Sequence, residues 1–136
     1  KGQRGVGFYV RGELWNMIYE IKRINERIAP FKLDDGKKWK MTVIQVSICA
    51  PTLDSSEEEK YRFYEVLTST INAEREYYTI VMGDFNAKIG KMNLNKMKYG
   101  TVGPYALEET NENGKRAVEL AYACDLKVAY KPCDLR

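Results

Sequence analysis

Hydrophobic and polar residues alternate most regularly between Met41 and Cys49, and this pattern predicts a β-strand. One face of the strand is mainly β-branched, whereas the other is more mixed. Pro51 ends the segment, because proline cannot donate to a sheet ladder. The first face holds Thr42, Ile44, Val46 and Ile48, and the second holds Met41, Val43, Gln45, Ser47 and Cys49.

A helix is expected after this strand. Ser56-Glu57-Glu58-Glu59 has the form of a capping box, and its acids suit the positive end of the helix dipole. Apolar positions at helical spacing continue to about Glu74. We expect the helix to bury Tyr64, Leu67 and Ile71, with Phe63 and Val66 beside them.

Three further elements follow in the pattern. The apolar run Thr79–Met82 predicts a buried strand, and a second helix is expected after Asn111 or Asn113, either of which can cap it. A last strand is expected at 126–130. The apolar stripe of the second helix consists of Ala117, Leu120, Ala121 and Cys124.

The N-terminal part of the chain is harder to interpret. Residues 7–10 have the composition of a short strand, and residues 34–38 are typical of a hairpin turn. Between them, residues 14–25 fit a helix by their apolar spacing, but the family resemblance described below favours extended chain, so both options stay open. Residues 90–110 have the composition of a loop that is long for a compact domain.

Strands and helices in this order predict an α/β fold. A chain of 136 residues is the size of one domain, so we expect a single domain over residues 1–136.

The most informative segment for chemistry is Gly83-Asp84-Phe85-Asn86-Ala87-Lys88-Ile89-Gly90, which follows the apolar run. Gly83 allows the backbone to turn as the strand ends. In extended backbone, Asp84 and Asn86 would point to the same side. The carboxylate can hold or deprotonate a water or bind a metal ion, and the amide can donate to a phosphate oxygen, so this pair suits phosphodiester chemistry. A turn in which both side chains satisfy local backbone groups is the alternative.

Three segments together resemble a known superfamily: the one just described, Val43–Thr52 with its Ala50-Pro51-Thr52, and Asn111–Arg116. Their order is similar to that of the endonuclease/exonuclease/phosphatase superfamily. The chain most resembles the endonuclease domain of LINE-type (non-LTR) retrotransposons, and host proteins of the craniofacial development protein 2 type look equally similar. The likeness runs from about Arg4 to the C-terminus. It implies a four-layer α/β sandwich, of which this chain would be a part, with two mixed sheets face to face and helices outside.

The resemblance also implies roles for individual residues. Asp84 matches the aspartate that positions or deprotonates the attacking water, and Asn86 matches the asparagine that contacts the scissile phosphate. Cys49 stands where the family usually has a phosphate-contacting tyrosine, and a thiol is a weaker donor. We also expect contacts to DNA from Lys88, Asn111, Asn113 and Arg116, with helix capping as the alternative for the two asparagines.

Other parts of the family's catalytic apparatus have no counterpart here. The resemblance implies an asparagine and a metal-binding glutamate before the point where this chain starts, and an aspartate–histidine pair after its last strand. The 136 residues contain no histidine, so no imidazole can stabilise charge on the phosphate. The parent family uses Mg²⁺, but Asp84 alone is insufficient to hold it, so we expect no metal ion to be bound. The chain is interpreted either as an excerpt of a working nuclease or as a decayed relic.

Charge adds a smaller indication. The net charge is +3, which permits nucleic-acid binding without requiring it. Lys88, Lys91, Lys96 and Lys98 follow the candidate motif without an intervening acid, and such a group would attract a polyanion. An ordinary solvated lysine loop is an equally good interpretation.

The cysteines and the apolar runs bear on location. Cys49, Cys124 and Cys133 lack the spacing of a zinc site and are odd in number, so we expect thiols in a reducing compartment, nuclear or cytoplasmic. Cys49 and Cys124 are expected in the core. We find no signal peptide and no apolar run long enough to cross a bilayer, and therefore expect no membrane partner.

Three functions are considered for this sequence. The first is a domain related to magnesium-dependent DNA endonucleases, with little or no activity in this chain. The second is a non-catalytic module that binds DNA or protein, and the third is a phosphatase for small phosphate esters, which the GDFNAKIG segment argues against. Exposed sheet edges in an incomplete sandwich would favour a homodimer.

Overall fold

The computed structural model describes residues 7–46, 50–90 and 109–129 of the chain. Its contacts divide the chain into two compact units. The sheet unit consists of Lys1–Ala50 and Glu65–Asp84, and the helical unit consists of Pro51–Tyr64 and Phe85–Arg136. Each unit is described by itself.

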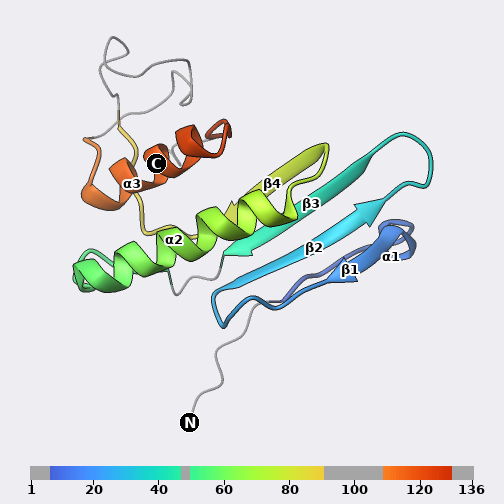
Figure 1. The fold of residues 1–136 in the computed structure, drawn as a ribbon, viewed down its shortest axis with the longest axis horizontal. Helices are drawn as coiled ribbons and strands as arrows, with labels where there is room; N and C mark the ends of the chain where they lie inside the picture. Colours follow the sequence, from blue (N-terminus) through green and yellow to red (C-terminus); the bar gives the residue numbers. More distant parts are fainter. Residues whose placement is uncertain (1–6, 47–49, 91–108, 130–136) are drawn as a thin grey trace, which may run out of the picture. The chain divides into compact units, whose positions relative to one another are not determined.

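The sheet unit is built on four strands in the order β1-β2-β3-β4 (Figure 1). These are β1 (Ile18–Ile21), β2 (Ile28–Asp34), β3 (Lys40–Val46) and β4 (Tyr78–Gly83). The pairs β1–β2 and β2–β3 are antiparallel, whereas β3 and β4 are parallel. The sheet is therefore mixed, with its parallel pair at the β4 end.

The predicted turn between β2 and β3 is confirmed. Gly36 has φ +68°, a conformation that glycine adopts without strain. The Asp35 carboxylate accepts hydrogen bonds from the backbone N–H groups of Lys37, Lys38 and Trp39 at 2.9–3.0 Å. This side chain takes the place of backbone partners in the turn and fixes the register of the hairpin.

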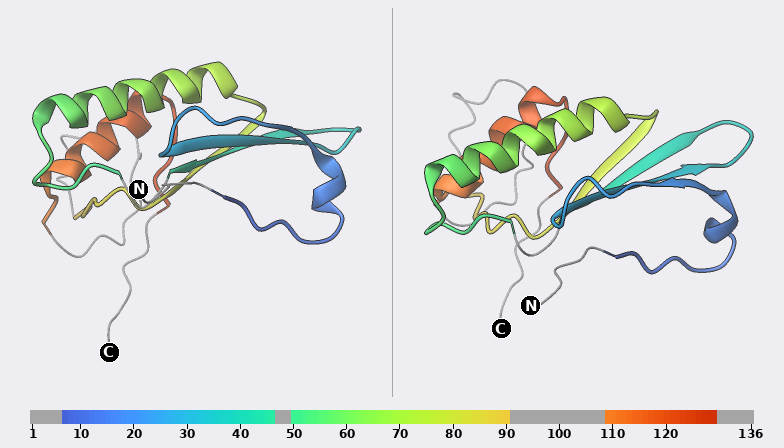
Figure 2. Two further views of the ribbon diagram at one scale, coloured as in Figure 1. Left: turned by 90° about the horizontal axis from the view of Figure 1, so that it is seen from below. Right: turned by 60° about the horizontal axis from the view of Figure 1, so that its bottom comes forward.

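One face of the sheet packs against the second half of α2 (Glu57–Glu74), as Figure 2 shows. The predicted β-branched face of β3 lies here, and Thr42, Ile44 and Val46 are all 0% exposed. The Thr42 hydroxyl donates to the backbone carbonyl of Glu74 at 2.6 Å, which satisfies a carbonyl at the end of the helix. From α2, Leu67 and Ile71 are completely buried, as predicted, and Phe63 and Tyr64 belong to the helical unit.

The opposite face carries a second cluster. Phe31, Leu33 and Val43 form it, and the ring of Phe8 packs edge-on against Phe31 with 4.3 Å between ring centroids. Residues 7–10, which contain Phe8, form no strand, so that prediction was wrong. Phe8 covers part of the sheet without joining its ladder, whereas the neighbouring Tyr9 is fully exposed.

Residues 14–25 contain both a short helix and a strand. A single helical turn, α1 (Leu14–Met17), leads directly into β1. Figure 2 shows α1 beside the turn end of the β2–β3 hairpin. Both interpretations of the sequence were thus correct for part of the segment.

The strand predicted at Thr79–Met82 exists as β4, but the prediction that it is buried was wrong. Its exposure alternates, and Tyr78, Ile80 and Met82 are 47%, 44% and 48% exposed. The register places these side chains beside Met41, Val43 and Gln45, on the face away from α2. This face of β4 is therefore an exposed apolar row.

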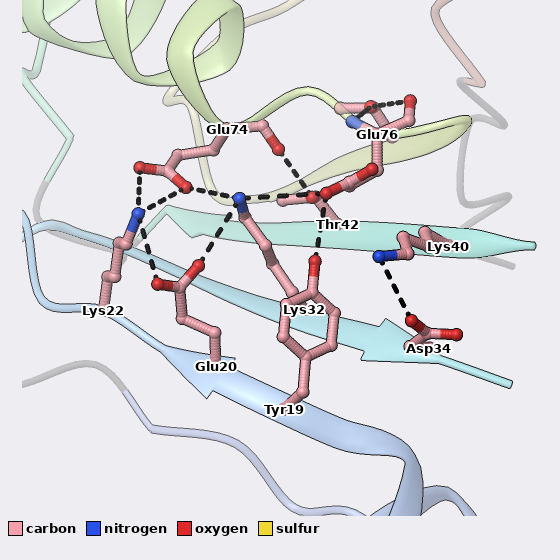
Figure 3. A network of polar contacts seen from close by, with 10 residues as sticks. Tyr19, Glu20, Lys22, Lys32, Asp34, Lys40, Thr42, Glu74 and Glu76 are labelled. Carbon is pink, nitrogen blue, oxygen red and sulfur yellow. Dashed lines mark hydrogen bonds and ion pairs between the residues drawn. The ribbon is translucent and has the colours of Figure 1, made fainter. Parts of the chain in front are cut away.

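An ion-pair network lies on the α2 side of the sheet (Figure 3). The carboxylate of Glu74, at the C-terminal end of α2, accepts hydrogen bonds from the ammonium group of Lys22 at 2.9 Å and 3.0 Å and forms an ion pair with Lys32 at 2.9 Å. Glu20 lies within 4.0 Å of both lysine nitrogens, and Glu76 lies within 4.0 Å of that of Lys32. Hydrogen bonds from Lys22 and Lys32 hold the pKa of Glu74 below its usual value.

The helical unit combines the first turns of α2 with α3 (Glu112–Ala123). The Ser56 hydroxyl accepts from the backbone N–H of Glu59 at 3.2 Å, which confirms the predicted cap of α2. In α3 the buried apolar side chains are Val118, Leu120 and Ala121, and Cys124 follows with 1% exposure. The core position expected for Cys124 is confirmed, whereas the stripe contains Val118 in place of Ala117.

The last predicted strand is reduced to a single bridge residue, Val128, within the described part of 126–130. The α/β class is confirmed, since the described residues form a four-stranded mixed sheet and helices. The four-layer arrangement and the single-domain assignment stay predictions.

Candidate functional site

β3 and β4 end side by side. Because they are parallel and Val46 pairs with Gly83, the chain leaves both strands at the same edge of the sheet. Gly83 has φ +153°, and a Cβ at this position would overlap the carbonyl oxygen of Val46. The predicted requirement for glycine here is confirmed, and the carboxyl ends of parallel strands are a usual place for ligand sites.

Asp84 follows directly and is exposed. The chain then enters the helical unit, where Asn86 is half-buried with φ +49°. This left-handed conformation is one that asparagine tolerates better than most residues. The backbone at Asn86 is not extended, and Asn86 belongs to a different unit from Asp84, so the expected alignment of the two side chains stays a prediction.

Within the helical unit, the segment after Asn86 is fixed to the start of α3. The backbone N–H of Lys88 donates to Oδ1 of Asn111 at 3.0 Å, and the backbone N–H of Asn111 donates to the carbonyl of Lys88 at 3.1 Å. The N–H of Gly90 donates to the Thr110 hydroxyl at 3.1 Å. These bonds join segments about twenty residues apart in the sequence.

Asn113 adds a second connection. Its side chain is 1% exposed, and its Nδ2 group donates to the carbonyl oxygens of Pro51 at 2.9 Å and Asn86 at 3.3 Å. Three distant segments thus meet at one amide. We call the arrangement of Asn86, Lys88, Asn111, Asn113 and Gly114 the asparagine clamp.

Gly114 permits the clamp to close. Its backbone N–H donates to Oδ1 of Asn111 at 2.7 Å, which is the N-cap bond of α3. A Cβ on Gly114 would overlap the carbonyl oxygen of Lys88. Only glycine allows the backbone of residue 88 to lie this close to the helix.

The residues that were predicted to contact DNA lie in different environments. Asn111 caps α3, which confirms the capping alternative for that residue, and Asn113 holds backbone carbonyls. Arg116 is paired with Glu57 of α2, while the Lys88 side chain is exposed. Cys49 lies outside the described residues, as do Lys91, Lys96 and Lys98. A direct role in DNA contact stays a prediction for each of them.

A polar network connects the first turns of α2 with α3. Glu57 accepts from Lys60 and Arg116, and these cations lower its pKa. Lys60 is 5% exposed and also donates to the carbonyl of Leu53 at 2.8 Å. The Tyr64 hydroxyl lies 3.4 Å from the carbonyl of Asn113, and burial raises the pKa of Tyr64 to about 12.

The sequence did not predict the roles of Gly114, Thr110 or the Pro51 carbonyl. The sequence signal was an asparagine at the start of a helix, Asn111 or Asn113, which indicated capping but gave no information on the distant partner segments.

The described residues do not fit a magnesium site by themselves. Among them, no three or more histidine, cysteine, aspartate or glutamate residues come together in a way that could hold a metal ion. Mg²⁺ prefers a near-octahedral set of oxygen ligands.

None of the helices in the described ranges has both the length and the apolar character that a membrane span requires.

Comparison with known proteins gives two relatives of the same kind. The chain is 31% identical over 128 residues to Craniofacial development protein 2 of Tragulus javanicus, a match that covers 93% of this chain and 21% of the relative. It is 32% identical over 121 residues to Craniofacial development protein 2 of Bos taurus, with 88% of this chain and 19% of the relative covered. The chain spans about a fifth of the length of these curated relatives.

No family model matches the chain, and no solved structure matches it. The predicted likeness to craniofacial development protein 2 is confirmed, whereas membership of the endonuclease superfamily stays a prediction. Over most of its length, the chain is similar to one part of craniofacial development protein 2.

Proposed function

We propose that this chain is part of a domain related to magnesium-dependent DNA endonucleases of retrotransposon origin. Its segment 84–90 is a phosphate-binding loop, and the parent fold is the four-layer α/β sandwich. The observation that carries the proposal is the position of Asp84 directly after β4, at the edge where parallel β3 and β4 both end. This edge is where open α/β sheets commonly bind ligands.

The asparagine clamp supports the proposal. A loop that binds a phosphate needs a fixed backbone, because ordering it on binding would cost affinity. The clamp supplies this order through bonds to the backbone of residues 86 and 88, and Thr110 adds a bond to the backbone of residue 90. In this account Asn111 and Asn113 are positioning residues, and the exposed side chain of Lys88 supplies positive charge that attracts a polyanion.

Catalysis by these 136 residues alone is not expected. They contain no histidine, and the described part provides no metal-binding cluster. Supercoiled plasmid incubated with the protein and Mg²⁺ should remain intact. Nicking at ordinary enzyme concentrations, abolished by Asp84→Ala, would refute the incomplete-nuclease account.

A non-catalytic module that binds a protein partner is the second candidate. The exposed apolar row of Tyr78, Ile80 and Met82 favours it, because such side chains in a row commonly mark an interaction surface. A filter-binding series with increasing salt separates the two candidates. Binding through phosphates must weaken steeply with salt, whereas a protein-binding module would show no affinity for DNA at any salt concentration.

A further inference from the structure

Asn113 is followed by glycine, and none of the other seven asparagines in the chain is. An asparagine next to glycine is chemically labile, because the following backbone nitrogen can attack the side-chain amide without hindrance from a Cβ. In this chain that labile pair is also the centre of the asparagine clamp. The same residue therefore has a structural role and a reactive sequence context.

The closed clamp blocks the reaction at both reacting groups. The attacking group, the backbone N–H of Gly114, is bonded to Oδ1 of Asn111 at 2.7 Å and belongs to α3. The leaving group, Nδ2 of Asn113, is held by the carbonyls of Pro51 and Asn86, and the side chain is 1% exposed. Attack requires the helical turn to open and the amide to rotate out of these bonds.

We propose that Asn113 is a latent deamidation site, protected while the asparagine clamp is closed and modified irreversibly when it opens. The nitrogen of Gly114 bonds to Cγ of Asn113 and gives up its proton. The Cγ–Nδ2 bond breaks, and Nδ2 leaves as ammonia with that proton. Water then opens the resulting cyclic imide to aspartate or isoaspartate, so the only co-reactant is water.

The product cannot restore the clamp. An aspartate carboxylate at residue 113 has no N–H to donate, and it would face the carbonyl oxygens of Pro51 and Asn86. Oδ1 of Asn113 is already buried without a hydrogen-bond partner among the described residues. The other carboxylate oxygen, in the place of Nδ2, would add the cost of burying a charged group without a donor. Opening followed by deamidation thus works in one direction and removes the bonds from residue 113 to Pro51 and Asn86. This inference is independent of whether the loop binds nucleic acid.

The test compares deamidation at Asn113 in the folded and the urea-denatured chain at mildly alkaline pH, by peptide mapping with mass spectrometry. Asn72, which is exposed and followed by alanine, serves as the internal reference. Because the reaction requires local opening, deamidation at Asn113 should be slower by about tenfold or more in the folded chain than in the denatured chain. Equal rates in the folded and denatured chains would overturn the proposal.

Two variants at residue 111 sharpen the test. Asn111→Ala removes the acceptor for Gly114 and Lys88 and should raise the folded-state rate toward the denatured one, whereas Asn111→Asp keeps an acceptor and should stay protected. If Asn111→Ala fails to fold, Asn113→Asp provides a separate measurement. Its Lys88 and Gly90 amides should exchange hydrogen faster than in the original protein, and unchanged exchange would contradict the predicted loss of the clamp.

Discussion

Gly114 and Lys88 lie so close together that a Cβ on the glycine would overlap the lysine carbonyl oxygen. The contact joins the first turn of α3 to the segment that follows Asn86, and the N–H of Asn111 donates to the same carbonyl at 3.1 Å. Two backbones approach here without an intervening side chain. The position of the candidate loop within the helical unit therefore depends on a residue that has no side chain.

Gly114→Ala should destabilise the protein, although the same change in an ordinary helix is favourable. Alanine gains about 0.5–1 kcal/mol over glycine inside a helix. Overlap with the Lys88 carbonyl should cost roughly 1–3 kcal/mol and outweigh this gain. Urea denaturation would measure the net effect. Gly7→Ala is the control, since a Cβ at that position would have no atom within 4 Å, and it should be close to neutral.

Asn111→Ala should lower stability, and Asn111→Asp should have much less effect. The asparagine oxygen accepts from Gly114 and Lys88, and an aspartate oxygen can accept both bonds as well. Loss of an N-cap costs about 0.5–2 kcal/mol, and the bond from Lys88 adds to this figure. Thermal or urea denaturation of the two variants gives the comparison. Equal destabilisation by the two variants would show that the side-chain oxygen of Asn111 does not account for its contribution to stability.

Glu74→Gln should destabilise the sheet unit at neutral pH and have little effect in acid. The pKa of Glu74 is lowered by hydrogen bonds from Lys22 and then Lys32, so its carboxylate stabilises the fold above the unfolded-state pKa. That contribution disappears as pH falls through the folded-state pKa. At neutral pH, loss of these charged hydrogen bonds should cost about 1.5–3 kcal/mol.

The matched control is Asp34→Asn in the neighbouring pair with Lys40 (Figure 3). Those two side chains are 33% and 52% exposed, against 9% for Glu74 and 12% for Lys32. An exposed pair contributes about 0–1 kcal/mol, so the control should change stability little. Free energies of unfolding from urea titrations between neutral and acidic pH test both variants, and a pH-independent effect of Glu74→Gln would contradict the ion-pair account.

Tyr64 should ionise at a higher pH than an ordinary tyrosine does. Burial raises its pKa from 10.0 to about 12, so the folded state keeps this proton where the unfolded state has lost it. Stability should therefore fall as pH rises from about 10 to about 12. Near-ultraviolet titration should show a late phenolate transition that Tyr64→Phe removes. Ionisation of Tyr64 at its ordinary pKa of 10.0 would show that its side chain is not buried as described.

The parts of the fold that follow from local pattern were predictable. Alternation placed Thr42, Ile44 and Val46 on one face of β3, which the structure shows to be buried, and Ser56 marked the start of α2. Local pattern was less informative for β4, because an apolar run is compatible with burial on one face or on both. Ile80 and Met82 were therefore expected inside and are exposed.

For the candidate site, the sequence predicted which residues take part but not how they are arranged in space. Asp84 and Asn86 were identified from a short motif, but the turn at Asn86 depends on bonds from Asn111 and Asn113. Those contacts join residues 25 and 27 positions apart, and Asn113 also reaches Pro51, 62 positions away. No local propensity contains information about such partners, so capping was the most that the sequence could indicate for these asparagines.

The segment from Asp84 to Lys88 is proposed to bind nucleic-acid phosphate. Backbone amide NMR spectra recorded while a short DNA duplex is added at low salt, with and without Mg²⁺, test it most directly. The account predicts that the largest shifts occur between residues 84 and 88, that they weaken as salt is raised, and that they diminish in Lys88→Ala. Binding that leaves these amides unchanged, or no binding at low salt, would contradict it.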